Sequence, residues 1–167
     1  ITLEEGIGVV KVRIRIEDGK PTFTQLDSAI APRFGPPAPD KEILARALSI
    51  RPEDLMEDGY IPQGVSCGVP FLFIPLKDLN ALSRANLNHS YWEKDLQSTW
   101  APHLFLLTFT TGEEGIDLRS RVFAPGMALD EDPASGSAAT ALGGYLGNLN
   151  PIKDGTLHWT VEQGVEM

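Results

Sequence analysis

The part of this chain best suited to chemistry is a run of acids, a proline and small residues, Asp-Glu-Asp-Pro-Ala-Ser-Gly-Ser-Ala-Ala at positions 130–139. It opens a helix-prone stretch that continues to Leu149. Pro133 has a fixed φ and pushes the preceding Asp132 into an extended conformation. We therefore expect Asp132 beside the first turn of the helix, where its carboxylate could exchange a proton with a bound molecule.

Small residues at the expected start of this helix suit the binding of an anion. Ser135, Gly136 and Ser137 favour the turn and the first helical positions, where backbone N–H groups have no partner inside the helix. These amides lie at the positive end of the helix dipole, so a ligand carboxylate or phosphate could be held there without Lys or Arg. On spacing alone, the commoner explanation is a capped surface helix preceded by an acidic turn at 130–132.

Ordered motifs along the chain favour the chemical interpretation. The longest is EDPASGSAATALGGYL at 131–146, preceded by Arg-Val-Phe-Ala-Pro at 121–125. Ser-Cys-Gly-Val-Pro stands at 66–70, and the chain opens with GIGVVKVRI at 6–14 and closes with Val-Glu-Gln-Gly-Val-Glu-Met at 161–167. In these motifs the sequence resembles the phenazine-biosynthesis PhzF-like isomerases, part of the diaminopimelate-epimerase-fold superfamily.

The resemblance implies an α+β fold of two similar lobes, each a mixed β-sheet or barrel curled around a central helix. The active site would lie in the cleft between the two helix mouths. Residues 1–167 would form a single lobe that resembles the C-terminal domain, with residues 1–16 crossing from the first lobe. The general base of the family is a glutamate on the first lobe, with a Gly-His pair beside it, and both would lie upstream of Ile1. The strands that follow the methionine matching Met167 would also be missing, so we expect a fragment, a processed piece or the product of a truncated gene.

The chemistry implied by the resemblance is a cofactor-independent proton shift on a small carboxylated substrate, without a metal. Such a shift needs a base, an acid and a clamp for the developing enolate. Asp132 and Ser137 would be the catalytic residues on this chain, and the substrate carboxylate would be held by Ser135, Gly136, Ser137 and Ala138. We expect the isolated chain to bind substrate but to turn over little, because the glutamate lobe is absent.

Two alternatives to this half-site enzyme stay open. The chain could be a non-catalytic module that binds small carboxylates, or an inactive fragment. The expected partners are a small carboxylated molecule and the missing N-terminal lobe or a second chain, with a homodimer as a further option. A serine hydrolase is excluded, because Ser135 and Ser137 lie in no Gly-x-Ser-x-Gly elbow.

Composition excludes other classes of function. The 167 residues are 42% hydrophobic and 22% charged, which is typical of a globular domain. A net charge of -9 argues against nucleic acid as a partner. The longest apolar run, at 69–76, is too short for a membrane span and contains Pro70 and Pro75. The single cysteine, Cys67, fits a reducing compartment and hence a cytoplasmic protein, and at the start of an apolar strand it is expected to pack rather than react.

Short strands broken by turns are expected to outnumber helices. Alternating apolar residues predict a strand over Val10–Ile16 with a hairpin partner over Pro21–Asp27, and the proline-rich stretch Ala31–Pro39 predicts an irregular linker. The other expected strands cover 60–66, 69–76, 103–110, 116–123 and 156–162. The expected helices cover 40–48, 52–56, 77–85, 88–96 and 138–146.

The remaining polar residues give weaker signals. His89, His103 and His158 lie far apart, on a helix start and two expected strands, without the spacing of a metal site, so they are expected to be structural. Arg121 could pair with the acidic turn at 130–132 or form an ordinary surface ion pair.

Overall fold

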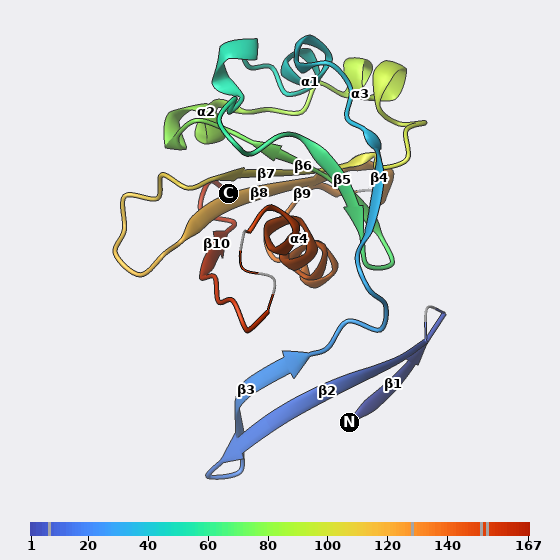
Figure 1. Cartoon of the computed structure of the whole chain (residues 1–167), viewed down its shortest axis with the longest axis vertical. Helices are drawn as coiled ribbons and strands as arrows, with labels where there is room; N and C mark the ends of the chain where they lie inside the picture. Colours follow the sequence, from blue (N-terminus) through green and yellow to red (C-terminus); the bar gives the residue numbers. More distant parts are fainter. Residues whose placement is uncertain (7, 128, 151, 153) are drawn as a thin grey trace.

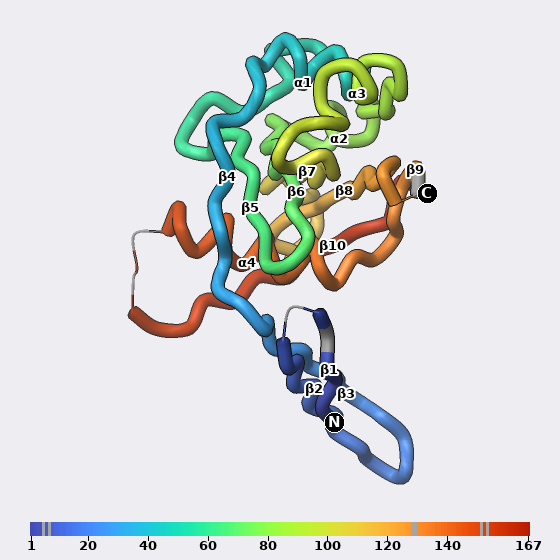
Figure 2. The backbone as a smooth tube through the Cα atoms, turned by 90° about the vertical axis from the view of Figure 1, so that its right-hand side faces the viewer, coloured from blue at the N-terminus to red at the C-terminus, as the bar shows by residue number. Residues whose placement is uncertain are grey.

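The computed structural model describes residues 1–6, 8–127, 129–150, 152 and 154–167, and it arranges them in two β-sheets (Figure 1). The smaller sheet, which we call the arm, is antiparallel in the order β1-β2-β3. Its strands are β1 (Thr2–Glu5), β2 (Gly8–Glu17) and β3 (Lys20–Leu26). Asp18 and Gly19 turn the β2–β3 hairpin with positive φ values of 50° and 75°, as a tight two-residue turn requires. The expected hairpin is therefore confirmed. Figure 2 shows that the arm extends away from the body of the molecule.

The larger sheet forms the body. Within the described residues it has seven strands in the order β10-β8-β7-β6-β5-β4, with β9 also paired to β8. The β6–β7 and β8–β10 pairs are parallel and the other pairs are antiparallel, so the sheet is mixed. The strands are β4 (Arg33–Pro37), β5 (Gln63–Ser66), β6 (Pro70–Pro75), β7 (His103–Thr108), β8 (Leu118–Ala124), β9 (Leu129–Asp132) and β10 (Val161–Gln163).

One face of this sheet is covered by a single long helix, α4 (Gly136–Leu149). The helix lies between the sheet and the arm in Figure 1. Its small and apolar residues pack on alternate side chains of the central strands, including Phe73 and Phe105. Tyr145 stacks on Phe73 and donates a hydrogen bond to the Ile61 carbonyl at 2.9 Å. Burial raises the pKa of Tyr145. The helix is thereby anchored on the sheet by a buried core.

The opposite face is covered by three shorter helices, α1 (Lys41–Ala47), α2 (Leu79–Arg84) and α3 (His89–Asp95). Their buried leucines and alanines join the other set of alternate strand residues in a second core. Asp54, in a short 3₁₀ helix over Pro52–Asp54, pairs with Arg51 and Arg84 at 3.1 Å each. The Arg51 and Arg84 guanidinium groups hold the pKa of Asp54 well below its usual range. None of the helices within the described residues is both long and apolar enough to cross a membrane.

The structure corrects the expected irregular linker at 31–39, because β4 occupies Arg33–Pro37. The strand pairs with β5 and lies at the edge of the sheet, with a register shift between Phe34 and Pro37. An edge strand needs partners on one side only, so prolines are tolerated there. The connection between arm and body is consequently shorter and spans residues 27–32.

Three further expectations need adjustment. The acidic residues at 130–132 are part of strand β9, not a turn. The last strand covers Val161–Gln163, and the preceding residues, with His158, are irregular. The 52–56 helix is a single 3₁₀ turn. The other expected helices and strands are present with ends shifted by a few residues, and the chain is a mixed α and β structure with four α-helices in the described part.

Candidate functional site

The start of α4 is a helix mouth with free donors. Ser135 is the N-cap, and its Oγ accepts a hydrogen bond from the Ala138 amide at 3.4 Å. Thr140 closes the first turn by donating to the Gly136 carbonyl at 2.8 Å. Among the described residues, no acceptor reaches the amides of Gly136 and Ser137. These two N–H groups are therefore available to an anion.

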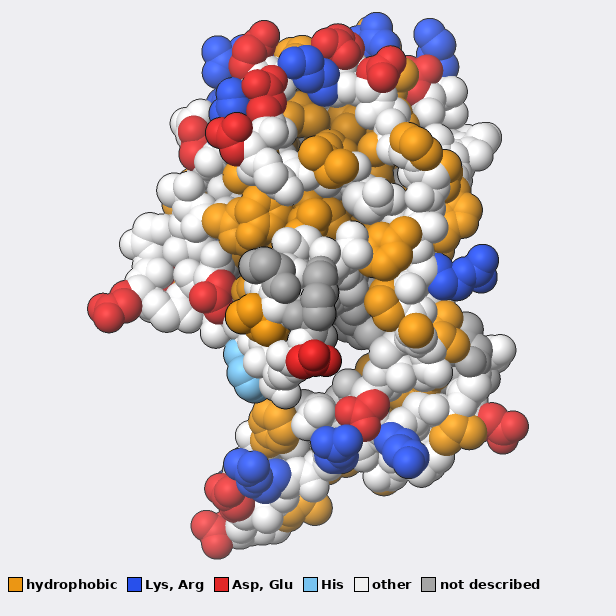
Figure 3. Space-filling model, viewed as in Figure 1, with side chains coloured by type: hydrophobic (Ala, Val, Ile, Leu, Met, Phe, Trp, Pro, Cys, Tyr) orange, Lys and Arg blue, Asp and Glu red, His pale blue; other side chains and the backbone are white. Residues whose placement is uncertain are grey.

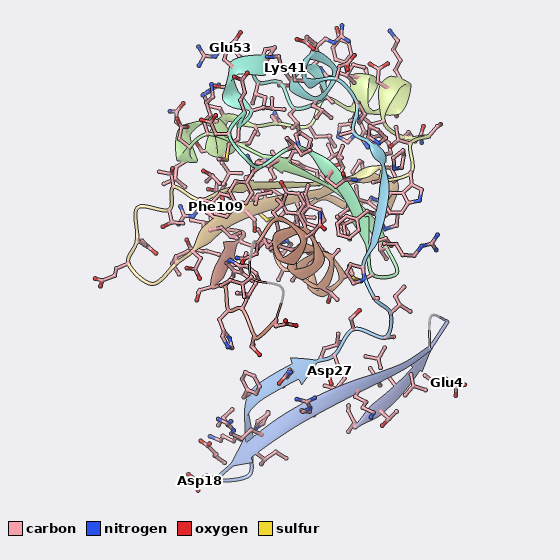
Figure 4. The ribbon with its side chains drawn as sticks, viewed as in Figure 1. Glu4, Asp18, Asp27, Lys41, Glu53 and Phe109 are labelled. Atoms are coloured by element: carbon pink, nitrogen blue, oxygen red, sulfur yellow. The ribbon has the colours of Figure 1, made fainter. Side chains whose placement is uncertain are left out.

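A cavity of about 270 Å³ lies at this helix mouth, between α4 and the arm. Figure 3 shows, from one side, an opening between the arm and the body. Figure 4 shows Asp27 where β3 joins the connection to the body. The cavity is lined by Val10, Leu26, Asp27, Ser28, Ala29, Cys67, Gly136, Ser137 and Thr140. Apolar walls with a few polar groups are typical of small-molecule sites.

The predicted site residues are close in sequence but occupy different environments in the structure. Gly136 and Ser137 line the cavity, Ser135 caps the helix, and Ala138 is buried in the core beneath α4. Asp132 ends β9, is half-buried, and is not among the residues that line the cavity. Its Oδ1 accepts a hydrogen bond at 3.1 Å from the amide of Ala134, which lies between β9 and α4.

Seven of the nine cavity residues were missed by the sequence analysis, among them Asp27, Cys67 and Thr140. The Asp27 carboxylate accepts hydrogen bonds from Arg13 at 2.8 Å and from Gln25 at 3.2 Å. Asp27 stands at the end of an expected hairpin strand, and nothing in the sequence around it indicates a binding or catalytic role.

Cys67 packs against the core beneath α4, as expected, and it also lines the cavity at the helix mouth. Cys67 is in the connection between β5 and β6, and its Sγ is 3.8 Å from the Thr140 carbonyl oxygen. Gly68 has a φ of 131°, and this reversal brings Cys67 back toward α4. The Ser-Cys-Gly motif at 66–68 was the available signal.

Arg121 forms a two-pronged ion pair with Glu131, the residue before Asp132. Its Nε and Nη2 donate to the two carboxylate oxygens of Glu131, each at 2.7 Å. Its Nη1 donates to the carbonyls of Leu82 at 3.0 Å and Ala85 at 2.6 Å. Arg121 is only 8% exposed, so of the two expected alternatives the pairing with the acidic segment is confirmed and the surface ion pair is wrong.

The histidines take no part in this site. His103 is buried against Phe71, and desolvation lowers its pKa. His89 lies 3.3 Å from the Asp130 carboxylate on the surface. Within the described residues, no three His, Cys, Asp or Glu side chains are grouped as metal ligands would be.

The fold and the site together define a mixed α and β structure with a small cavity at the mouth of its longest described helix. The whole chain, residues 1–167, matches the family model described as phenazine biosynthesis-like protein, PhzC-PhzF. The chain therefore belongs to this family.

Individual relatives agree with this assignment. An uncharacterised isomerase of Mesorhizobium japonicum and another of Bacillus subtilis are each 31% identical over 99% of the chain. The chain spans 55% of the length of each of these relatives.

Solved structures show the same fold. A PhzF-family phenazine biosynthesis protein of Bacillus anthracis superposes with a TM-score of 0.80 at 24% identity, covering 99% of this chain and 55% of that one. A predicted epimerase of Pseudomonas aeruginosa superposes with a TM-score of 0.58 at 27% identity, covering 88% of this chain and 44% of that one.

Proposed function

We propose that this chain carries one half of the active site of a cofactor-independent isomerase or epimerase. The reaction would be a proton shift on a small carboxylated substrate. Family membership and the isomerase names of two relatives support the reaction class. The observation that carries the proposal is the cavity at the mouth of α4, which is lined by Gly136 and Ser137, whose amides have no acceptor within the described part of the chain.

Each predicted residue has a role in this proposal. The amides of Gly136 and Ser137, with the Ser137 hydroxyl, bind the substrate carboxylate. Ser135 and Ala138 support this cradle, because the Ser135 cap fixes the Ala138 amide. Asp132 polarises or relays a proton at the substrate amine or hydroxyl. Charge that develops in the enolate is stabilised by the same preorganised amides, without reorganisation during the reaction.

The base would come from the remaining lobe of the protein or from a second chain. Residues 1–167 would then be the C-terminal lobe, with its strands curled around α4 as part of a barrel. The arm supports the need for a partner, because six apolar side chains of its strands remain 40–64% exposed. They are Leu3, Val9, Ile14, Ile16, Phe23 and Leu26. Uncovered apolar surface of this kind marks a contact region. We place the protein in the cytoplasm.

A second candidate is a binding module without catalysis. It is favoured by one observation: Asp132 is absent from the cavity lining, and its carboxylate is engaged by the Ala134 amide. In that case the helix mouth would bind a carboxylate and Asp132 would only cap the turn.

Proton exchange with solvent separates the two candidates. The protein is incubated in D₂O with a panel of L- and D-α-amino acids and cyclohexene carboxylates, and loss of each C–H signal is followed by NMR. We expect exchange when the remaining lobe is present, and a 10²- to 10⁴-fold loss in Asp132→Asn, about the usual contribution of a general acid or base. Asp130→Asn is the matched control, since the Asp130 side chain is 88% exposed.

The isolated 167-residue chain provides the second arm of the test. We expect it to bind a simple carboxylate such as benzoate in calorimetry, with weaker binding in Ser137→Ala, and to show little turnover. Robust turnover by the isolated chain would show that the half-site proposal is wrong. Binding without exchange, even with the other lobe present, would support the binding module instead.

A further inference from the structure

Glu131, the residue just before Asp132, is held from the face of the sheet that α2 covers. Arg121 and Glu131 form a two-pronged ion pair, and the Glu131 side chain is only 16% exposed. Arg121 is fixed in turn by the carbonyls of Leu82 and Ala85 at the end of α2. A planar guanidinium with this many fixed partners has one orientation. Glu131 is consequently tied to the α2 side of the body.

Strand geometry transmits this constraint to Asp132. Successive side chains on a strand point to opposite faces, so Glu131 and Asp132 face different sides. Asp132 pairs with Val122 on β8, and Val122 belongs to the core beneath α4. Fixing Glu131 toward α2 therefore fixes Asp132 toward the α4 side, where the helix mouth lies.

The other side of Asp132 is held by the segment that ends β10. Gln163 donates its side-chain N–H to the Asp132 carbonyl at 2.6 Å. Gly164 follows with a φ of 82°, and a Cβ at this position would lie 2.8 Å from the Pro133 carbonyl oxygen. β10 itself is attached to β8 by an ion pair between Arg119 and Glu162, which raises the pKa of Arg119. The Asp132–Pro133 peptide is thus held between β8, which pairs with Asp132, and the end of β10.

We propose that Arg121 and Gln163 are positioning residues for Asp132: together they hold its backbone so that its carboxylate points to the helix mouth. The catalytic meaning of this clamp rests on the proposed function, in which Asp132 relays a proton. Arg121 acts through Glu131 and Gln163 acts through the Asp132 carbonyl, and neither is required to touch the substrate. Loss of either would leave the amides of Gly136 and Ser137 in place and would displace only the proton-relaying group.

The test uses two variants with matched controls in the intact protein. Arg121→Lys keeps the charge but loses the two-pronged geometry, and Gln163→Met keeps the length but loses the donor. Arg84→Lys is the control for the first, because Arg84 also lies on the α2 side and pairs with the buried Asp54. Gln97→Met, at an exposed position, is the control for the second.

The first readout requires no activity. The Ala134 amide donates to the Asp132 carboxylate, so its NMR chemical shift reports this hydrogen bond. We expect the resonance to move away from its position in the parent protein in Arg121→Lys and Gln163→Met, and to stay in place in both controls. An unmoved resonance in both variants, or an equal movement in the controls, would overturn the proposal. If Arg121→Lys does not fold, Gln163→Met decides alone.

The second readout separates this inference from the proposed function. In the solvent-exchange assay, a positioning role predicts a 10- to 100-fold lower kcat with KM changed less than threefold, because carboxylate binding is retained. An active parent protein with unchanged kcat in both variants would refute the clamp and leave the proposed function intact. No exchange in the parent, with the Ala134 effect still present, would refute the proposed function and support the clamp as the device that orients Asp132.

Discussion

A glycine pair in α4 provides a sharp test of how the arm is attached to the body. A Cβ at Gly144 would lie 2.5 Å from Cβ and 3.0 Å from Cγ of Pro32, whereas a Cβ at the adjacent Gly143 meets nothing within 4 Å. Alanine at either position gains about 1 kcal/mol of helix propensity. Only Gly144→Ala must also displace a rigid proline ring, and overpacking of this kind costs about 1–3 kcal/mol.

The two variants therefore differ by the packing cost alone, because the propensity gain cancels between them. We expect Gly143→Ala to be more stable than the parent by up to about 1 kcal/mol and Gly144→Ala to lie about 1–3 kcal/mol below Gly143→Ala. With a urea slope of about 2 kcal/mol/M, their unfolding midpoints should be separated by about 0.5–1.5 M. Pro32→Gly should reduce this difference in a double-mutant cycle. Midpoints within about 0.2 M of each other would refute the close contact.

Three further predictions concern titration and hydrogen bonding. The arginine partners of Asp54 lower its folded-state pKa, so the stability that Asp54 contributes should be present above about pH 4 and lost as the pH falls further. Asp54→Asn should flatten that part of an acid-unfolding curve. Burial lowers the folded-state pKa of His103, so its contribution should be lost as the pH falls below about 6.5, and urea midpoints of His103→Gln should vary less between pH 7 and 5. Tyr145→Phe, which loses the bond to the Ile61 carbonyl, should cost about 1 kcal/mol in urea unfolding, and the exposed Tyr91→Phe should be neutral; equal effects would contradict the buried bond.

Features that depend on residues close together in the sequence were predictable. The alternation from Val10 to Ile16 and the Asp18-Gly19 turn specify the hairpin locally, and the Ser135-Gly136 step specifies where α4 begins. In each case the responsible residues are neighbours in the chain, so the residue types and the spacing of apolar residues are enough to predict the local structure.

Features that depend on distant partners were not predictable in the same way. The prolines of 33–37 form a strand only because β5 is available on one side of a sheet edge. The segment 129–132 becomes a strand because β8 pairs with it, and Arg121 is buried because α2 offers it carbonyl acceptors. Cys67 reaches the helix mouth through a reversal at Gly68 that the apolar pattern does not show.

The arm and the candidate site depend on the same contacts. Val10 is 6% exposed and is the one apolar arm residue among the described residues that is fully buried, and it also lines the cavity. The connection at 27–32 contributes Asp27 to the cavity and presses Pro32 against Gly144 on α4. A shift of the arm would therefore remove one wall of the cavity while leaving the amides of the helix mouth intact. Ligand affinity should consequently depend on arm placement, whereas the proposed proton relay would depend on how Asp132 is held.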